Sequence, residues 1–338
     1  MTDEITVSNS QIKTFRRCRK AWAYKYIEKL EPKEKKRAPY LGNWIHRCLE
    51  TYYKEGDWKI GHNEYLKQWD SLFEEEREEL SKKNGPLPDA VKRILFSYLW
   101  YWKHDGWKVL DVEYEFDLVV GSFSYKGVKV VVHVTGYVDL VVEDEQDDTR
   151  WVIDHKTTGN IPEQNAFHAM DPQLLIYPVA VAKKHGSITG VQYNYIRSRP
   201  ASQPQITKAG KISRRKIVTD YPTVVRFLKK EGFNPKDFSD FLRPLKKSSP
   251  LMKRYRLPRE PVVTKKILED VIRTSRDIYA EREQTEHVRT ITASCKMLCE
   301  FHDICRGELN GYDMTHLKKA HFQIRTREKP RGDKFDEE

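Results

Sequence analysis

Residues 136–159 read GYVDLVVEDEQDDTRWVIDHKTTG, and this stretch decides the fold. Two runs rich in Val, Ile and aromatic residues flank the acidic turn EDEQDD, a pattern typical of two consecutive strands. The first run carries Asp139 among apolar neighbours, and the second contains Asp154-His155-Lys156. Burying a carboxylate is costly unless it is paired or binds a cation. We therefore expect the two strands to bring Asp139 and Asp154 together as a divalent-metal site.

The D-x-K sequence predicts that a lysine lies beside the metal site. Asp154 and Lys156 project to the same side of a strand because the side-chain period is two. Carboxylate oxygens suit Mg²⁺ or Mn²⁺, which keep several waters and accept phosphate oxygens. Lys156 could then orient the attacking water and offset the charge of the transition state. Alone, however, a D-x-K sequence also fits an exposed strand end.

The segments on either side of this stretch predict a mixed α/β chain. His46 shares a face of one predicted helix with residues three or four positions away, and Cys18 falls inside another. The predicted helices are 8–30, 41–54, 60–105 in two segments divided by NGPLP, 169–185 and about 258–290. The predicted strands lie in VLDVEYEFDLVVG, VKVVVHVTGYVDLVVED, TRWVIDHKT and VQYNYIRSR.

Positive charge is concentrated downstream of these strands. The chain of 338 residues carries a net charge of +11. Residues 201–266 hold 18 Lys and Arg against 5 Asp and Glu, a local net charge of +13, so the remainder is slightly acidic. Such asymmetry is typical of a surface that binds a polyanion, although a solvated face would have the same composition. The predicted DNA-binding residues are Lys208, Lys211, Arg214, Arg215 and Lys216.

The cysteines favour metal ligation over a disulfide framework, because five is an odd number and three of them cluster near the C-terminus. Cys18, Cys295, Cys299 and Cys305 supply four thiolates, the number that holds a [4Fe–4S] cluster. The alternative is a local Zn²⁺ site of Cys295, Cys299, His302 and Cys305. Cys48 is interpreted as a small buried apolar residue. The absence of a leader or a long apolar run predicts a soluble, cytoplasmic protein without membrane contact.

Five pieces in order resemble the PD-(D/E)xK nuclease superfamily, specifically its RecB-like branch. These pieces are SNSQIKTFRRCRKAW, GNWIHRCLE, GYVDLVV, WVIDHKTTG and QLLIY. The resemblance covers most of residues 8–197 and resumes at 295–305. It implies a restriction-endonuclease-like mixed sheet flanked by helices, with metal-dependent hydrolysis of DNA phosphodiesters.

The resemblance also assigns roles to individual residues. It implies that His46, Asp139, Asp154 and the main chain of His155 bind the metal, with Lys156 beside the water. Gln173 and Tyr177 would contact the active site and the DNA. The AddB-type iron–sulfur exonucleases of this branch, and those associated with CRISPR adaptation, pair one N-terminal cysteine with three near the C-terminus. Here three residues, instead of the usual two, separate Cys295 from Cys299.

We therefore expect five parts in the chain. They are a helical part at 1–108, a nuclease core at 109–200, a basic DNA-path extension at 201–290, a cysteine cluster at 291–306 and a partly disordered polar tail at 307–338. The expected function is an exonuclease acting on DNA ends or single strands in recombination, repair or replication. A structure-specific endonuclease and a non-catalytic nucleic-acid-binding or assembly protein are the alternatives. Without a Walker A sequence, any helicase or recombination partner must be another chain, and a phage-encoded enzyme would act in the host cytoplasm.

Overall fold

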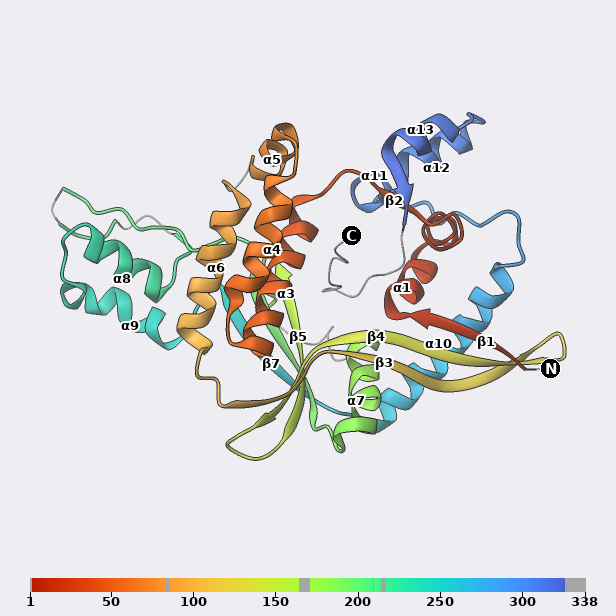
Figure 1. Ribbon diagram of the computed structural model, residues 1–338, viewed down its shortest axis with the longest axis horizontal. Helices are drawn as coiled ribbons and strands as arrows, with labels where there is room; N and C mark the ends of the chain where they lie inside the picture. Colours follow the sequence, from red (N-terminus) through yellow and green to blue (C-terminus); the bar gives the residue numbers. More distant parts are fainter. Residues whose placement is uncertain (1, 83–84, 164–170, 209, 214–216, 326–338) are drawn as a thin grey trace.

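A six-stranded mixed sheet forms the centre of the molecule (Figure 1). The computed structural model describes residues 2–82, 85–163, 171–208, 210–213 and 217–325. The strands are β1 (Thr2–Ser8), β3 (Trp107–Tyr125), β4 (Val128–Asp144), β5 (Arg150–Thr158), β6 (Gly190–Arg197) and β7 (Met252–Pro258). This architecture confirms the predicted mixed α/β core flanked by helices.

The long strand β4 organises the sheet. It pairs antiparallel with β3 along one edge. Its other edge is shared, because β1 pairs in parallel with its first half and β5 pairs antiparallel with its second half. Beyond β5 the sheet continues through the parallel β6 to the antiparallel β7. The predicted succession of three strands, a helix and a further strand is confirmed for β3, β4, β5, α7 (Pro172–His185) and β6.

Two strands of the central sheet, β1 and β7, were not predicted from the sequence. In β1, Ile5 and Val7 are buried and alternate with exposed neighbours, so a short period-two signal was present. In β7 the basic residues Lys253, Arg254 and Arg256 interrupt the apolar positions, so no clear period-two pattern indicated the strand. The central sheet therefore includes a strand from residues 201–290, the segment that the sequence analysis assigned to a basic extension.

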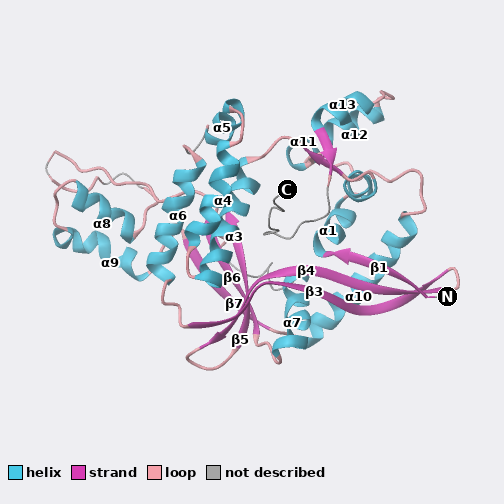
Figure 2. Ribbon diagram, viewed as in Figure 1, coloured by secondary structure: helices cyan, strands magenta, loops and turns pink. Residues whose placement is uncertain are grey.

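Helices cover the sheet from several sides (Figures 1 and 2). Helices α7 and α10 (Pro261–Glu281) pack on β3, and a main apolar core joins them and α1 (Asn9–Arg17) to the sheet. A second core holds a helical arm together, made of α3 (Arg37–Glu55), α4 (Trp58–Asp70), α5 (Glu74–Ser81) and α6 (Leu87–Trp102). The sequence predicted two helical segments in 60–105, but the structure has three, because the helix ends after α4 and a separate helix α5 begins at Glu74.

The remaining elements lie at the two ends of the molecule (Figure 1). A small lobe beyond the helical arm contains α8 (Tyr221–Lys230), the 3₁₀ helix η3 (Pro235–Phe238) and α9 (Ser239–Lys247). The opposite end contains β2 (Leu30–Pro32), α11 (Cys295–Leu298), α12 (His302–Leu309), α13 (Thr315–His321) and β8 (Phe322–Ile324). There β2 pairs antiparallel with β8, which joins the first part of the chain to its last described part.

The first predicted helix, 8–30, is interrupted at Cys18. Cys18 has an extended backbone, with φ −165° and ψ 118°, and separates α1 from α2 (Arg19–Trp22). A π-helical turn (Ala23–Ile27) follows. The prediction that Cys18 lies inside a helix was therefore wrong, because the apolar spacing continues across a break of one residue. The long C-terminal helix is also shorter than predicted, since α10 ends at Glu281 and β7 occupies 252–258.

Some predictions fall outside the described residues. Residues 164–170, just before α7, and Arg214, Arg215 and Lys216 belong to this group, as does the tail beyond residue 325. Within the described part of the chain, none of the helices has the length and hydropathy needed to span a membrane.

Candidate active site

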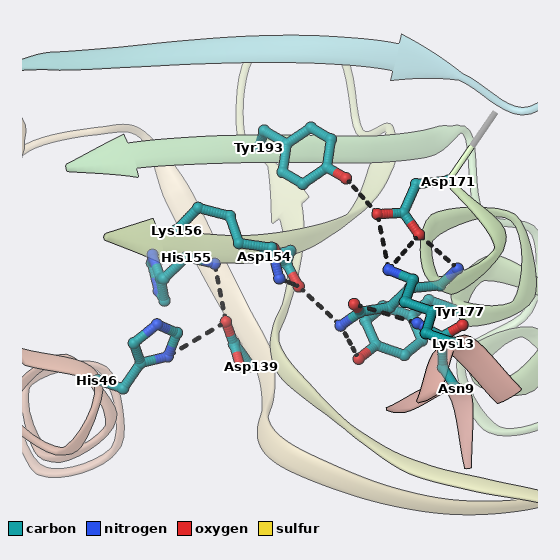
Figure 3. Close-up of polar contacts among 11 residues, drawn as sticks. Asn9, Lys13, His46, Asp139, Asp154, His155, Lys156, Asp171, Tyr177 and Tyr193 are labelled. Atoms are coloured by element: carbon teal, nitrogen blue, oxygen red, sulfur yellow. Dashed lines mark hydrogen bonds and ion pairs between the residues drawn. The ribbon is translucent and has the colours of Figure 1, made fainter. Parts of the chain in front are cut away.

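The two predicted carboxylates meet where β4 and β5 separate. The β4–β5 pairing ends at Leu140 and Ile153, so Asp139 and Asp154 are the next residues on each strand. Asp139 Oδ2 accepts a hydrogen bond of 2.7 Å from the main-chain N–H of His155 (Figure 3). The side chain thus reaches across to the neighbouring strand at the point where the ladder ends. This brings Asp139 close to Asp154, as the sequence predicted.

Lys156 compensates the charge of a fully enclosed carboxylate. Asp154 is 2% exposed, and Lys156 Nζ lies 3.1 Å from its Oδ1 and 2.8 Å from its Oδ2. Burial raises the pKa of Asp154, Lys156 opposes this shift, and the charge of Asp139 adds to it. The side chain of Lys156 remains about one-third exposed. Two neighbouring carboxylates with one such cation form a site that favours additional positive charge.

Helix α3 delivers His46 to the same place. Gly42 lies one turn before His46, and a Cβ atom at Gly42 would come within 2.8 Å of Thr157 Oγ1 on β5. The missing side chain therefore allows α3 to approach the strand closely. His46 is buried, and its Nδ1 lies 3.5 Å from Asp139 Oδ2. The helix and the two strands thus bring their three predicted residues together.

Helix α7 contributes Gln173, which contacts Asp154. Gln173 Nε2 donates to Asp154 Oδ1 at 3.2 Å and to Tyr177 Oη at 2.5 Å. The two α7 residues are four apart and therefore share a face. Tyr177 thus accepts a hydrogen bond from the same amide that contacts the carboxylate.

Several supporting residues were missed by the sequence analysis. Asp171 caps α7, accepts from Tyr193 Oη at 3.3 Å and pairs with Lys13 Nζ at 3.0 Å. Asn9 Nδ2 donates to Gln173 Oε1 at 3.4 Å. Helix α1 therefore fastens to the start of α7 beside the site. A cap residue before a helix could have identified Asp171, but no local pattern relates Asn9 or Lys13 to it.

The side chain of His155 points away from Asp154, into a buried polar cluster. Its Nδ1 lies 2.8 Å from Asn194 Nδ2, and its ring stacks on Tyr53 with the centroids 5.9 Å apart. Tyr98 Oη joins this cluster by accepting from Asn194 Nδ2 at 2.8 Å. Because these groups come from four separate elements, no local sequence pattern predicts the cluster. It fixes the main chain between the two D-x-K residues.

Two further glutamates lie in β3. Continuing the β3–β4 register places Glu113 opposite Asp139, and Glu113 has a positive φ of 50°. Left-handed backbone is unusual for glutamate and concentrates at functional sites. Glu115 is exposed and accepts a 2.6 Å hydrogen bond from Tyr137 Oη. Both residues belong to β3 and lie within the predicted strand VLDVEYEFDLVVG.

The donor set fits a divalent cation by its chemistry. It combines the carboxylates of Asp139 and Asp154 with the imidazole of His46 and the main chain of His155, which is an oxygen-rich set. Across the described ranges, no three His, Cys, Asp or Glu side chains form a ready-made ligand group. In the structure, Asp139 contacts the His155 N–H and Asp154 contacts Lys156.

The four predicted cluster cysteines line one cavity of about 370 Å³. Cys18 enters it from the break between α1 and α2, Cys295 and Cys299 flank α11, and Cys305 comes from α12. All four are half-buried, whereas Cys48 is buried in the core of the helical arm, as predicted. The fold therefore brings residues nearly 300 positions apart to a common space.

Backbone N–H groups surround these sulfurs. The N–H of Thr290 donates to Cys18 Sγ at 3.5 Å, and that of Thr292 donates to Cys295 Sγ at 3.4 Å. The contacts with Thr292 lower the pKa of the Cys295 thiol. Burial raises the pKa of Cys299. His302 also lines the cavity, but its Nδ1 already lies 2.9 Å from Asp303 Oδ1.

Of the predicted DNA-binding residues, Lys208 and Lys211 are described, and both are exposed. They lie in a short hairpin closed by a bridge between Ile206 and Ile212. The hairpin follows β6, which is hydrogen-bonded to the D-x-K strand β5. The other three predicted residues lie outside the described part of the chain.

A family model supplies the decisive comparison. The model of the PD-(D/E)XK nuclease superfamily matches residues 6–306, which include all the residues of this centre and the four cysteines. This chain belongs to the PD-(D/E)XK nuclease superfamily. It is therefore a nuclease by family, and phosphodiester hydrolysis is the reaction class of its site.

Other comparisons add little to this assignment. No curated protein matches the nuclease. Among solved structures, it is similar to that described as "Crystal structure of SSO0001", with 13% sequence identity and a TM-score of 0.28. That match covers 78% of this chain and 83% of the other. A similarity of this size carries no argument, so the fold and family rest on the family model and the geometry.

Proposed function

We propose that this nuclease is a Mg²⁺- or Mn²⁺-dependent DNA exonuclease of the RecB-like branch. The observation that carries the proposal is the enclosed Asp154, held by Lys156 and Gln173 beside Asp139. Such a centre has little use in a protein that only binds nucleic acid, because two carboxylates repel phosphates. A cation between carboxylates and phosphate resolves this conflict, which favours metal-dependent hydrolysis.

Four groups would hold the metal: the side chains of His46, Asp139 and Asp154 and the main chain of His155. When bound, Mg²⁺ or Mn²⁺ supplies a Lewis acid for the phosphoryl oxygen and an activated water. Gln173 orients Asp154 through its donated hydrogen bond, and Tyr177 orients Gln173. The cluster around His155 holds the main chain that carries the proposed carbonyl ligand.

Lys156 would stabilise the negative charge of the transition state. Its ammonium group lies beside Asp154 and its side chain stays partly exposed, so it can face a bound phosphate. A fixed cation in this position acts most strongly on the charge that develops during attack. We therefore assign Lys156 to the reacting phosphate and to the orientation of the water.

Cys18, Cys295, Cys299 and Cys305 would hold a [4Fe–4S] cluster. Their shared cavity and the N–H groups directed at two of the sulfurs support this assignment. Hydrogen bonds to sulfur are one of the means by which proteins tune such clusters. The cluster would fasten the α1–α2 junction to α11 and α12. Zn²⁺ bound by Cys295, Cys299, His302 and Cys305 is the alternative, and the presence of Cys18 in the same cavity favours the cluster.

The proposed substrate is a DNA end or single strand in recombination, repair or replication, with any helicase or recombination partner supplied by another chain. The basic segment 201–266 favours a polyanion. The test is incubation of the purified protein with linear single-stranded DNA, linear duplex and circular duplex, with Mg²⁺, Mn²⁺ or EDTA. End labels at each terminus report polarity, and an RNA of equal length tests the sugar.

The expected result is metal-dependent release of short products from linear DNA, with circular DNA left intact. Cleavage of circular DNA or internal cutting at junctions would identify an endonuclease instead. Binding of DNA without hydrolysis under every metal condition would support the non-catalytic alternative.

A further inference from the structure

A second cavity, of about 430 Å³, lies beyond the end of β6. Arg197 and Arg199 line it together with polar and apolar side chains, and none of the described lining residues is acidic. The polar residues are Ser202, Gln203, Gln205 and Ser213. Its size falls within the range of small-ligand pockets, about 300–1,000 Å³. The lining therefore suits an anion of about the size of a phosphate or nucleotide.

The strand register links this cavity to the catalytic face. Lys156 on β5 pairs with Tyr195 on β6, and Thr158 pairs with Arg197. Because side chains alternate along a strand, Arg197 projects to the same face as Tyr195 and Lys156. Two residues along a strand span about 7 Å, roughly the rise of two phosphates along a duplex strand. The cavity thus begins where the catalytic face ends.

The two arginines differ in their internal contacts. Arg197 Nε donates to Gly159 O at 3.2 Å, which fixes the side chain against the loop after β5. Arg199 is exposed, and its side chain forms no ion pair with the residues that the structure describes. An arginine fork matches the oxygens of phosphate in a bidentate manner. One arginine is therefore held in place by the protein, and the other is available to a ligand.

We propose that this cavity binds a phosphate group of the substrate strand on one side of the scissile bond. The proposal rests on the proposed function. Beyond the cavity, the hairpin that carries Lys208 and Lys211 continues the basic surface. The phosphate is either an internal diester or the terminal monoester of the strand, since both present the same oxygens to arginine.

The test measures binding of single-stranded 12-mers, with and without a terminal phosphate, to the Asp154→Asn protein without added divalent metal. Adding Arg199→Ala should weaken binding about tenfold and lower the salt slope by about 0.7. Arg199→Lys should recover the slope but only part of the affinity. Arg273→Ala on α10, which removes an arginine that is also largely exposed, is the matched control and should bind like the parent.

The oligonucleotides distinguish the two sources of phosphate. If the cavity binds an internal diester, Arg199→Ala should lower the affinity for both 12-mers equally. If it binds a terminal monoester, the substitution should lower the affinity only for the phosphorylated 12-mer. Equal affinity and salt slope in the parent, Arg197→Ala and Arg199→Ala proteins would overturn the subsite, even if the wild-type protein hydrolyses DNA. Conversely, Arg199-dependent binding by a wild-type protein that hydrolyses nothing would leave the subsite standing and overturn the proposed function.

Discussion

Asp139 Oδ2 accepts a hydrogen bond of 2.7 Å from the main-chain N–H of His155. This contact begins one step beyond the last paired residues of β4 and β5. The Asp139 carboxylate therefore accepts the hydrogen bond of a β5 N–H group beyond the end of the β4–β5 pairing, and this contact orients the carboxylate. Because the same β5 segment carries Asp154 and Lys156, one hydrogen bond sets the positions of all three groups relative to one another.

Asp154→Asn should abolish metal-dependent hydrolysis and leave DNA affinity unchanged or higher. The substitution keeps the shape of a buried side chain but removes a charge that would hold the metal and repel phosphate. Gel assays of hydrolysis and anisotropy measurements of binding check the two parts separately. Wild-type digestion by this variant would remove Asp154 from the site.

Lys156→Ala should lower kcat about 100- to 1,000-fold while the protein remains folded. Lys156 is partly exposed, so the loss falls on charge stabilisation in the transition state more than on the core. Single-turnover kinetics with saturating Mg²⁺ measure the effect, and a thermal melt controls for folding. A loss confined to KM would instead make Lys156 a binding residue.

Gln173→Ala should lower kcat about tenfold or more, and Tyr177→Phe should lower it less. Gln173 contacts Asp154 directly, whereas Tyr177 acts through Gln173. In the double variant, Tyr177→Phe should therefore add almost nothing to Gln173→Ala. Multiplicative losses in this double-mutant cycle would show that Tyr177 contacts the substrate independently.

Cys18→Ala should remove a brown colour, with its absorption near ~400 nm, from protein purified without oxygen. It should also lower stability, because cluster ligation fastens α1 to α11 and α12 and thereby contributes to folding. His302→Ala is the matched control and should keep the colour. A colourless wild-type protein containing zinc, damaged by His302→Ala but not by Cys18→Ala, would establish the Cys₃His alternative.

Acid should destabilise the helical arm through His62. Burial, with a smaller contribution from Lys92, lowers its pKa to about 4, and the ring stacks on Trp44 with the centroids 5.2 Å apart. The unfolded chain binds the proton near pH ~6.5, so stability falls as pH drops from there toward 4, by about 1.4 kcal/mol per pH unit from this group. Urea unfolding should be less pH-dependent in His62→Phe, and an identical slope between pH 6.5 and 5 would contradict this role.

The strands and helix of the candidate active site were predictable because the patterns that indicate them are local. Period-two alternation places Asp154 and Lys156 on one face, and helical spacing places Gln173 and Tyr177 on another. The strand β7 was not, because Arg254 and Arg256 belong to polar contacts with Asp105 and Asp144 that no neighbouring sequence reveals. Likewise, a break of one residue at Cys18 leaves the surrounding apolar spacing intact.

By itself, the sequence determined the residue types and their local faces: a D-x-K strand, a histidine helix, four cysteines and a basic segment. Tertiary structure alone decided which of these meet. The register of β4 against β5 sets the Asp139–His155 contact, and the packing of α1 on α10 and the sheet brings Cys18 to the cysteines near residue 300. The physical reason is that periodicity arises from the local backbone. Convergence of distant segments instead depends on long-range burial that offsets the entropy of closing large loops.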